Sequence, residues 1–226
     1  MKAGVVVFPG SNCDRDVKVA LEKCGFETQF LWHKEHYIPE NTDLVVLPGG
    51  FSYGDYLRCG AISAHSNIIK EVKQFADKGG YVLGICNGFQ VLTETHLLPG
   101  TLVRNRDINF ICKDVFLKPE NVETDFTAKF DGKSNVKISV AHHDGNYFID
   151  DEGLKAINDN GQIAFRYCDE NGEISQLSNP NGSVENIAGV FNQRKNILGL
   201  MPHPERHVDP LTGGEDGKYL FDSLLG

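Results

Sequence analysis

Residues 81–90 read YVLGICNGFQ, and within this decapeptide the pattern changes from strand to helix. Residues 81–85 form a short apolar run of the kind that makes a buried strand. The run leads into GICNG (84–88), in which two glycines flank a nucleophilic side chain. This spacing is typical of a nucleophile elbow, a strand-to-helix turn too tight for side chains at its flanks. We therefore predict an α/β protein in which Cys86 projects from the carboxyl end of a strand.

The chain before the elbow alternates strands with helices. Apolar runs at 4–8 and 44–47 predict buried strands, and a further strand is expected near 26–31. A helix capped by Ser11 and a second helix from Ser66 are expected, because apolar residues recur there every three to four positions. Such alternation predicts a mostly parallel central sheet, buried on both faces, in a three-layer arrangement with flanking helices.

The sequence pattern changes after about residue 101, where short strand-like runs are separated by clusters of turn residues. We predict an antiparallel strand extension of the central sheet here. The polar stretch 168–183 is expected to be an exposed hairpin or long loop without an assigned role. No flexible linker divides the chain, so residues 1–226 are predicted to form a single domain. The predicted strands of this half are 110–117, 136–140, 163–167, 187–192 and 197–201.

Composition excludes several classes of function. The 226 residues include 22 basic and 31 acidic side chains, a formal charge of −9, and the pI is about 5.3. This balance argues against nucleic-acid binding and against a polybasic membrane anchor. The opening MKAGVVVFPG is too short for a signal sequence, and no apolar stretch has the length of a membrane span. The prediction is a cytoplasmic protein with no nucleic-acid or membrane partner.

The cysteines and histidines do not form a metal-binding motif. The six cysteines include no C-x-x-C pair, and five of them are expected to be ordinary, mostly buried free thiols. His203 and His207 have the spacing of a helical metal site, but the intervening Pro204 excludes a helix. We expect no metal. The five ordinary cysteines are Cys13, Cys24, Cys59, Cys112 and Cys168.

Cys86 differs from these thiols through its position. At the N-terminus of a helix, unpaired N–H groups and the helix dipole favour a thiolate. The backbone N–H of Asn87 would face an oxyanion formed by attack on a carbonyl group. The turn Leu47-Pro-Gly-Gly50, at the end of another predicted parallel strand, offers a second donor, because no Cβ atom obstructs its N–H groups.

A thiolate nucleophile needs a proton-transfer partner and a carboxylate that orients it. The segment MPHPER (201–206) supplies both. His203 follows an apolar run and so lies at the end of a predicted strand. Residues i and i+2 of an extended segment project to the same side, so Glu205 can reach His203. We predict a triad of Cys86, His203 and Glu205.

The glycine-rich stretch GGEDGK (213–218) is not a phosphate-binding loop. Thr212 stands where the first glycine of that motif belongs, and Tyr219 stands where a serine or threonine would coordinate magnesium. The chain is therefore expected to bind no nucleotide.

Longer signatures suggest a family. With Gly-x-Cys-x-Gly-x-Gln, His203-x-Glu205 and an earlier Gly-Gly turn, the sequence resembles the class I (triad) glutamine amidotransferases. Nearly end to end, it is similar to the glutaminase subunits of phosphoribosylformylglycinamidine synthases, and residues 51–62 separate these from other triad amidotransferases. The signatures are PGSNCDRD (9–16), LPGGFSYGDYLRCGAI (47–62), GICNGFQVL (84–92) and GLMPHPERHVD (199–209).

This resemblance implies a site and a reaction. Cys86 would attack the side-chain amide of glutamine, His203 would act as acid and base, and Glu205 would orient it. Gly50 and Asn87 would donate backbone N–H groups to the oxyanion. The resemblance also makes Gln90 a residue that helps to hold glutamine.

The same resemblance implies partners. Ammonia would pass to a large synthetase subunit that uses ATP and magnesium to convert phosphoribosylformylglycinamide to the amidine in purine biosynthesis, and a small third subunit would bridge the two. This chain would bind no cofactor. Residues 141–145 read AHHDG where the family usually has AHGEG, and this segment would line the glutamine pocket.

Two alternatives remain at this point. One is another cysteine hydrolase of the α/β-hydrolase type, although there the acid precedes the histidine in the chain, whereas Glu205 follows His203. The other is a non-catalytic amidotransferase-like subunit that only docks. The intact predicted triad argues against the second alternative.

Overall fold

The computed structural model describes residues 1–226, and its centre is a nine-stranded sheet. Five neighbouring strands at one side of the sheet run parallel. Four of these strands are mostly buried, as their apolar sequences require, whereas the edge strand β2 has only Leu31 buried and corrects the predicted burial of the sheet on both faces. In spatial order they are β2 (Glu27–Trp32), β1 (Lys2–Val7), β3 (Leu44–Leu47), β4 (Tyr81–Ile85) and β11 (Ile197–Leu200).

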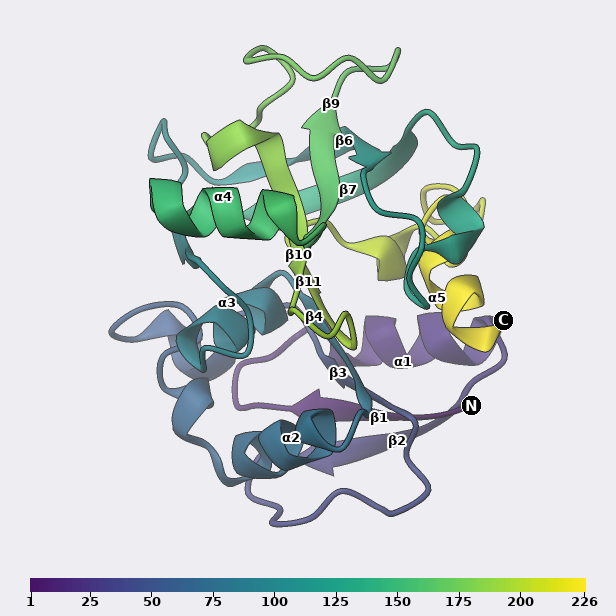
Figure 1. Ribbon diagram of the computed structural model, residues 1–226. Coiled ribbons are helices and arrows are strands. Elements are labelled where there is room, and N and C mark those ends of the chain that lie inside the picture. Colours follow the sequence, from purple (N-terminus) through teal and green to yellow (C-terminus); the bar gives the residue numbers. More distant parts are fainter.

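Helices cover both faces of the parallel strands (Figure 1). α1 contacts β1 and β2 on one face, whereas α2 and α3 pack on the other. This placement follows from right-handed crossovers, because the chain moves outward from β1 to β2 and in the opposite direction from β3 to β4. The helices are α1 (Asp14–Lys23), α2 (Asn67–Asp77), α3 (Asn87–Glu94), α4 (Asp151–Asp159) and α5 (Lys218–Leu225).

The other side of the sheet is antiparallel, as predicted for the second half of the chain. A separate two-stranded sheet lies close to α3. The antiparallel strands follow β11 in the order β10 (Ile187–Phe191), β9 (Ile163–Cys168), β6 (Ile111–Pro119) and β7 (Val136–His142), and the small sheet pairs β5 (Thr101–Val103) with β8 (Asn146–Phe148).

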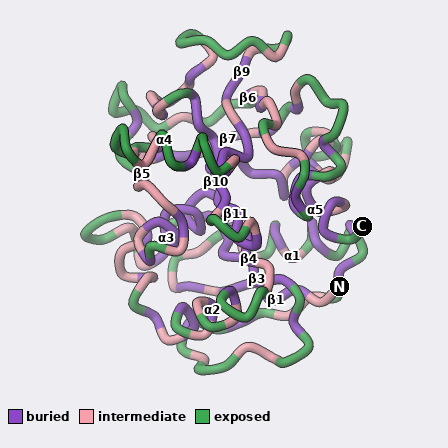
Figure 2. The backbone as a smooth tube through the Cα atoms, viewed as in Figure 1, coloured by how far each residue is buried: buried purple, intermediate pink, exposed green.

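One hydrophobic cluster of 51 buried residues extends through both parts of the sheet. The buried sections of chain follow β3, β4, β11 and β10 through the middle of the molecule (Figure 2). None of the helices is long and apolar enough to cross a lipid bilayer.

Strand β11 corrects the predicted division of the sheet. Its sequence lies among the antiparallel runs, yet it pairs in parallel with β4, placing Gly199 opposite Gly84. All four β11 residues are buried, which is the environment of a central strand covered on both faces. β11 therefore lies between the nucleophile strand and the antiparallel extension, and it ends beside the elbow.

Other predictions need smaller corrections. Ser11 is not the cap of α1; Cys13 precedes the helix instead, because Ser11 is bridged to Gly50. Helices α4 and α5 and the small sheet were absent from the predicted elements. The middle of the stretch 168–183 is mostly exposed as expected, but Cys168 at its start and Asn181 and Ser183 at its end are buried.

Candidate active site

Cys86 lies at a nucleophile elbow between β4 and α3. Its backbone has φ 50° and ψ −105°, a conformation that L-residues rarely adopt and that surrounding packing must maintain. The side chain is buried, with Sγ 3.8 Å from the carbonyl oxygen of Ala141 on β7. The strained turn directs the sulfur away from the strand, as predicted.

The two glycines around Cys86 are required because a side chain at either position would clash with its neighbours. A Cβ atom at Gly84 would lie 2.5 Å from Leu92 Cδ1, and one at Gly88 would lie 1.9 Å from the carbonyl oxygen of Leu47. Real Cβ atoms do not approach so closely. The prediction that the turn is too tight for side chains at both flanking positions is confirmed.

His203 and Glu205 form a buried pair at the end of β11. The Nδ1 atom of His203 lies 2.6 Å from Glu205 Oε1, and both side chains are almost fully buried. The backbone N–H of His203 donates to Ser139 O at 2.8 Å, which ties this segment to β7. Burial opposes a charge on the imidazole, but Glu205 and Cys86 outweigh it and raise the pKa of His203 above its ordinary value.

Gly49 brings the pair and the nucleophile together. A Cβ atom at this position would lie 2.8 Å from His203 Cε1 and 3.4 Å from Cys86 Cβ. The imidazole and the nucleophile therefore flank one glycine. Because Nδ1 faces Glu205, Nε2 is the nitrogen left to exchange a proton with Cys86, and this buried atom has no hydrogen-bond partner in the protein.

The predicted oxyanion donors lie at the same place. Gly50 follows Gly49 with φ 130°, and Asn87 is the first residue of α3. None of the hydrogen bonds of loops and turns uses the N–H of Gly50 or Asn87 as donor. A Cβ atom at Gly50 would lie 2.6 Å from Asn12 N, so only glycine fits between the elbow and the loop before α1.

Gln90 lies one helical turn after Cys86, but its side-chain amide is engaged within the protein. It donates through Nε2 to Asp144 O at 2.7 Å and accepts from Asn87 Nδ2 at 2.8 Å. Asn87 also donates to Asp55 Oδ1 at 3.3 Å. Gln90 thus holds the loop after β7 against α3, which places residues 141–145 beside the nucleophile.

This loop is fixed by polar residues that sequence reasoning missed. Asn105 Nδ2 donates to His142 O, and its Oδ1 accepts from Gly145 N. Asn181 Nδ2 donates to Gly145 O at 2.7 Å from the far end of the 168–183 stretch. That stretch, for which we predicted no role, therefore helps to position the loop. No local pattern could reveal these contacts, because the partners are about 36 to 40 residues apart.

His142 makes the stability of this region dependent on pH. Burial, with a contribution from His203, lowers the pKa of His142 from 6.5 to about 4. As the pH falls below 6.5, His142 becomes protonated in the unfolded chain, whereas in the folded protein it stays neutral until about pH 4. We expect the free energy of unfolding to lose about 1.4 kcal/mol per pH unit from this group across that window.

The variant His142→Gln isolates this contribution. Chemical denaturation of both proteins between pH 7 and pH 4.5 should give a shallower pH dependence for the variant, whatever its stability at pH 7. Identical slopes for the two proteins would contradict the assignment.

His207 and the glycine-rich stretch 213–218 have structural roles. His207 Nε2 accepts the backbone N–H of Ser139 at 3.0 Å, so this histidine anchors β7. A Cβ atom at Gly217 would lie 2.0 Å from Pro204 O, so the stretch packs against the His203 segment. It leads into α5 with no strand directly before it, unlike a phosphate-binding loop.

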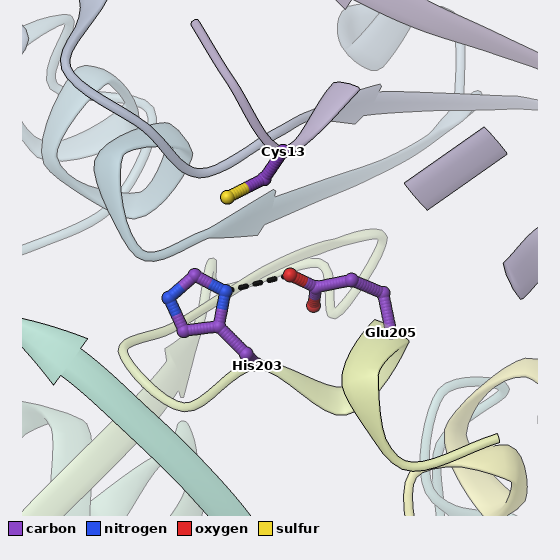
Figure 3. Close-up of side chains that lie close together, drawn as sticks. All are labelled: Cys13, His203 and Glu205. Carbon is purple, nitrogen blue, oxygen red and sulfur yellow. Dashed lines mark hydrogen bonds and ion pairs between the residues drawn. The ribbon is translucent and has the colours of Figure 1, made fainter. Parts of the chain in front are cut away.

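Cys13 lies beside the buried pair of His203 and Glu205 (Figure 3). Its sulfur points toward His203 and Glu205, and one ligand atom from each of the three residues lies within 4.8 Å of the others. Yet Nδ1 and Oε1 are only 2.6 Å apart, whereas two ligands of a tetrahedral zinc ion are separated by roughly 3.3 Å. The arrangement fits a hydrogen-bonded pair with a neighbouring thiol better than a metal centre.

The remaining cysteines mostly fit their prediction. All six are free thiols, and Cys24 and Cys168 are buried. Cys112 is exposed on β6, which corrects the expectation of burial for that residue.

Comparisons with known proteins identify close relatives. The family of CobB/CobQ-like glutamine amidotransferase domains matches residues 1–214. The chain is 55% identical to the phosphoribosylformylglycinamidine synthase subunit PurQ of Pelagibacter ubique, covering 100% of this chain and 98% of the relative. It is 54% identical to PurQ of Jannaschia sp., covering 99% and 97%. The structure of PurLQS from Thermotoga maritima aligns with a TM-score of 0.87 and 45% identity, covering 99% of this chain and 97% of that chain.

Proposed function

Because this chain belongs to the glutamine amidotransferase family and, within it, to the PurQ subunits of phosphoribosylformylglycinamidine synthase, we propose that Cys86, His203 and Glu205 carry out its glutaminase half-reaction. The protein is a glutaminase subunit of purine biosynthesis. The α/β-hydrolase alternative is wrong, since the relatives match from end to end. The observation that carries the residue assignment is the fully buried His203–Glu205 bond, held by Gly49 against the strained elbow of Cys86.

The reaction begins with proton transfer from the Cys86 thiol to His203 Nε2. The sulfur attacks the side-chain amide carbon of glutamine, and the N–H groups of Gly50 and Asn87 stabilise the oxyanion. His203 then gives its proton to the departing nitrogen, so the carbon–nitrogen bond breaks and ammonia leaves. Glu205 keeps the imidazole in the tautomer that these transfers need.

The resulting γ-glutamyl thioester is hydrolysed by water. His203 Nε2 removes a proton from the water as its oxygen attacks the thioester carbon. The carbon–sulfur bond breaks, the proton returns to Cys86, and glutamate leaves. Neither half of the cycle requires a metal or an organic cofactor from this chain, and we assign ATP and magnesium to the synthetase partner.

The ammonia is consumed in a complex. The relatives are subunits of a synthase, and PurLQS supports a large synthetase subunit and a small bridging subunit as the partners. Ammonia in neutral water is mostly ammonium, which is not nucleophilic, so direct transfer to the synthetase preserves its reactivity. We place the complex in the cytoplasm, which agrees with six free thiols.

Glu205→Gln tests the assignment of the orienting carboxylate. The amide is nearly isosteric, but it does not stabilise an imidazolium and can hold the wrong tautomer. We expect kcat for glutamine hydrolysis in the assembled complex to fall by about 10³-fold or more, with a much smaller change in KM. Steady-state kinetics measure both parameters.

Labelling provides the control for this variant. A glutamine-analogue electrophile should modify Cys86 in the unchanged protein, as seen by peptide mapping, and more slowly in Glu205→Gln. Unchanged turnover in Glu205→Gln, or an adduct on a different cysteine, would refute the proposed triad.

A further inference from the structure

Cys13 contacts two parts of the active site that are far apart in the sequence. Its backbone N–H donates to Gly49 O at 3.4 Å, and a Cβ atom at Gly49 would lie 3.4 Å from Cys13 Sγ. On the other side, Arg206 donates from Nη2 to Cys13 Sγ at 3.5 Å. Cys13 thus lies between the Leu47–Gly50 turn, which offers an oxyanion donor, and the segment that carries His203 and Glu205.

Arg206 lies between the buried carboxylate of Glu205 and the surface, since it approaches that carboxylate and is itself partly exposed. Its Nε atom lies 4.0 Å from Glu205 Oε1, and its side chain is 33% exposed, whereas that of Glu205 is fully buried. A hollow of about 300 Å³ lies alongside them, next to Val19 and Lys23 of α1. If the guanidinium moved into this hollow, water could reach the carboxylate that holds His203.

Glu205 has few other restraints. Its Oε1 atom takes the bond from His203, but its Oε2 atom is buried without a hydrogen-bond partner. The position of the carboxylate therefore depends on the groups packed around it. Burial and the nearby Glu205 raise the pKa of Cys13 to about 11, so its thiol stays neutral at physiological pH and adds no charge beside the carboxylate.

We propose that Cys13 is a positioning residue for catalysis: its sulfur holds the guanidinium of Arg206 over Glu205, and so keeps Glu205 aligned with His203. The thiol is not a second nucleophile. It acts through Arg206, and its buried, uncharged sulfur accepts a hydrogen bond without competing with Glu205 for the imidazole proton. This inference rests on the triad assigned above.

Alanine and serine at position 13 separate this role from simple packing. In the complex with the synthetase partners, Cys13→Ala should lower kcat for glutamine hydrolysis about tenfold and leave KM for glutamine within about twofold. The hydroxyl of Cys13→Ser can still accept from Arg206, so kcat should stay within about threefold of the unchanged protein. The matched control is Cys24→Ala, a buried cysteine at the other end of α1, which should keep its kcat.

A double-mutant cycle tests whether the effect passes through Arg206. In the Arg206→Gln background, Cys13→Ala should cause little further loss of kcat, because the contact it removes is already absent. Additive losses would overturn the proposal, as would a rise in KM in place of the fall in kcat. Equal losses for Cys13→Ser and Cys13→Ala, or for Cys13→Ala and Cys24→Ala, would also overturn it.

Thermal unfolding of each variant shows that the comparison is made between folded proteins. Failure of this proposal leaves the triad intact, since Glu205→Gln would still show its loss of kcat. Failure of the triad would appear separately, as unimpaired turnover in that variant.

Discussion

Replacement of Cys86 by alanine should abolish glutamine hydrolysis and leave ammonia-dependent synthesis by the complex intact. Without the sulfur no thioester can form, so we expect the glutaminase rate to fall by at least about 10³-fold. Ammonium salts at alkaline pH would bypass this subunit, because they supply ammonia to the synthetase directly. The two measurements are glutamate release from glutamine and product formation from added ammonia.

Cys24→Ala is the control for this experiment. Cys24 is buried at the end of α1, away from the elbow, and its removal should affect neither reaction. Persistent glutamate release in Cys86→Ala would exclude Cys86 as the nucleophile. Normal glutaminase activity with a docking defect alone would instead favour a non-catalytic role for this residue.

Gly88→Ala should destabilise the protein strongly, although alanine normally stabilises a helix interior relative to glycine by about 1 kcal/mol. The added Cβ atom would lie 1.9 Å from Leu47 O, and this obstacle is the backbone of β3. Neither β3 nor α3 can shift to relieve the clash without disturbing the elbow. We expect a loss of about 3 kcal/mol or more in the free energy of unfolding, or roughly 10 °C in Tm for a chain of this size.

Gly25→Ala is the matched control for Gly88→Ala. Gly25 has φ 97° and no atom near the position of an added Cβ, so its substitution costs only backbone strain of about 1–2 kcal/mol. Calorimetry of both variants compares the clash with the strain. A Gly88→Ala protein as stable as the unchanged one would show that the elbow is looser than its geometry indicates.

The elbow could be predicted because its constraints are local. Nearby atoms leave no room for a Cβ atom at Gly84 or Gly88. This steric requirement is visible in the sequence as the five-residue motif GICNG. The contact between His203 and Glu205 was also predicted correctly, but the predicted reason was wrong. Residues Pro204–Arg206 form a 3-10 turn in place of an extended segment, and this turn brings Glu205 back to His203.

The position of β11 and the role of Cys13 could not be predicted in the same way. The order of strands in a sheet depends on which surfaces bury one another, and the apolar run ILGL (197–200) does not indicate which strands it pairs with. Nothing in the sequence distinguishes Cys13 from an ordinary buried cysteine. Its contact with Arg206 spans 193 residues, so no motif connects the two.

The position of β11 also affects when the enzyme can become active during its own synthesis. β4 leaves the ribosome more than 110 residues before its partner β11, so one edge of β4 stays unpaired until β11 has been made. Pairing between segments so distant is slow, and exposed edges invite aggregation. We expect newly made chains to remain unable to consume glutamine until β11 has been inserted beside β4.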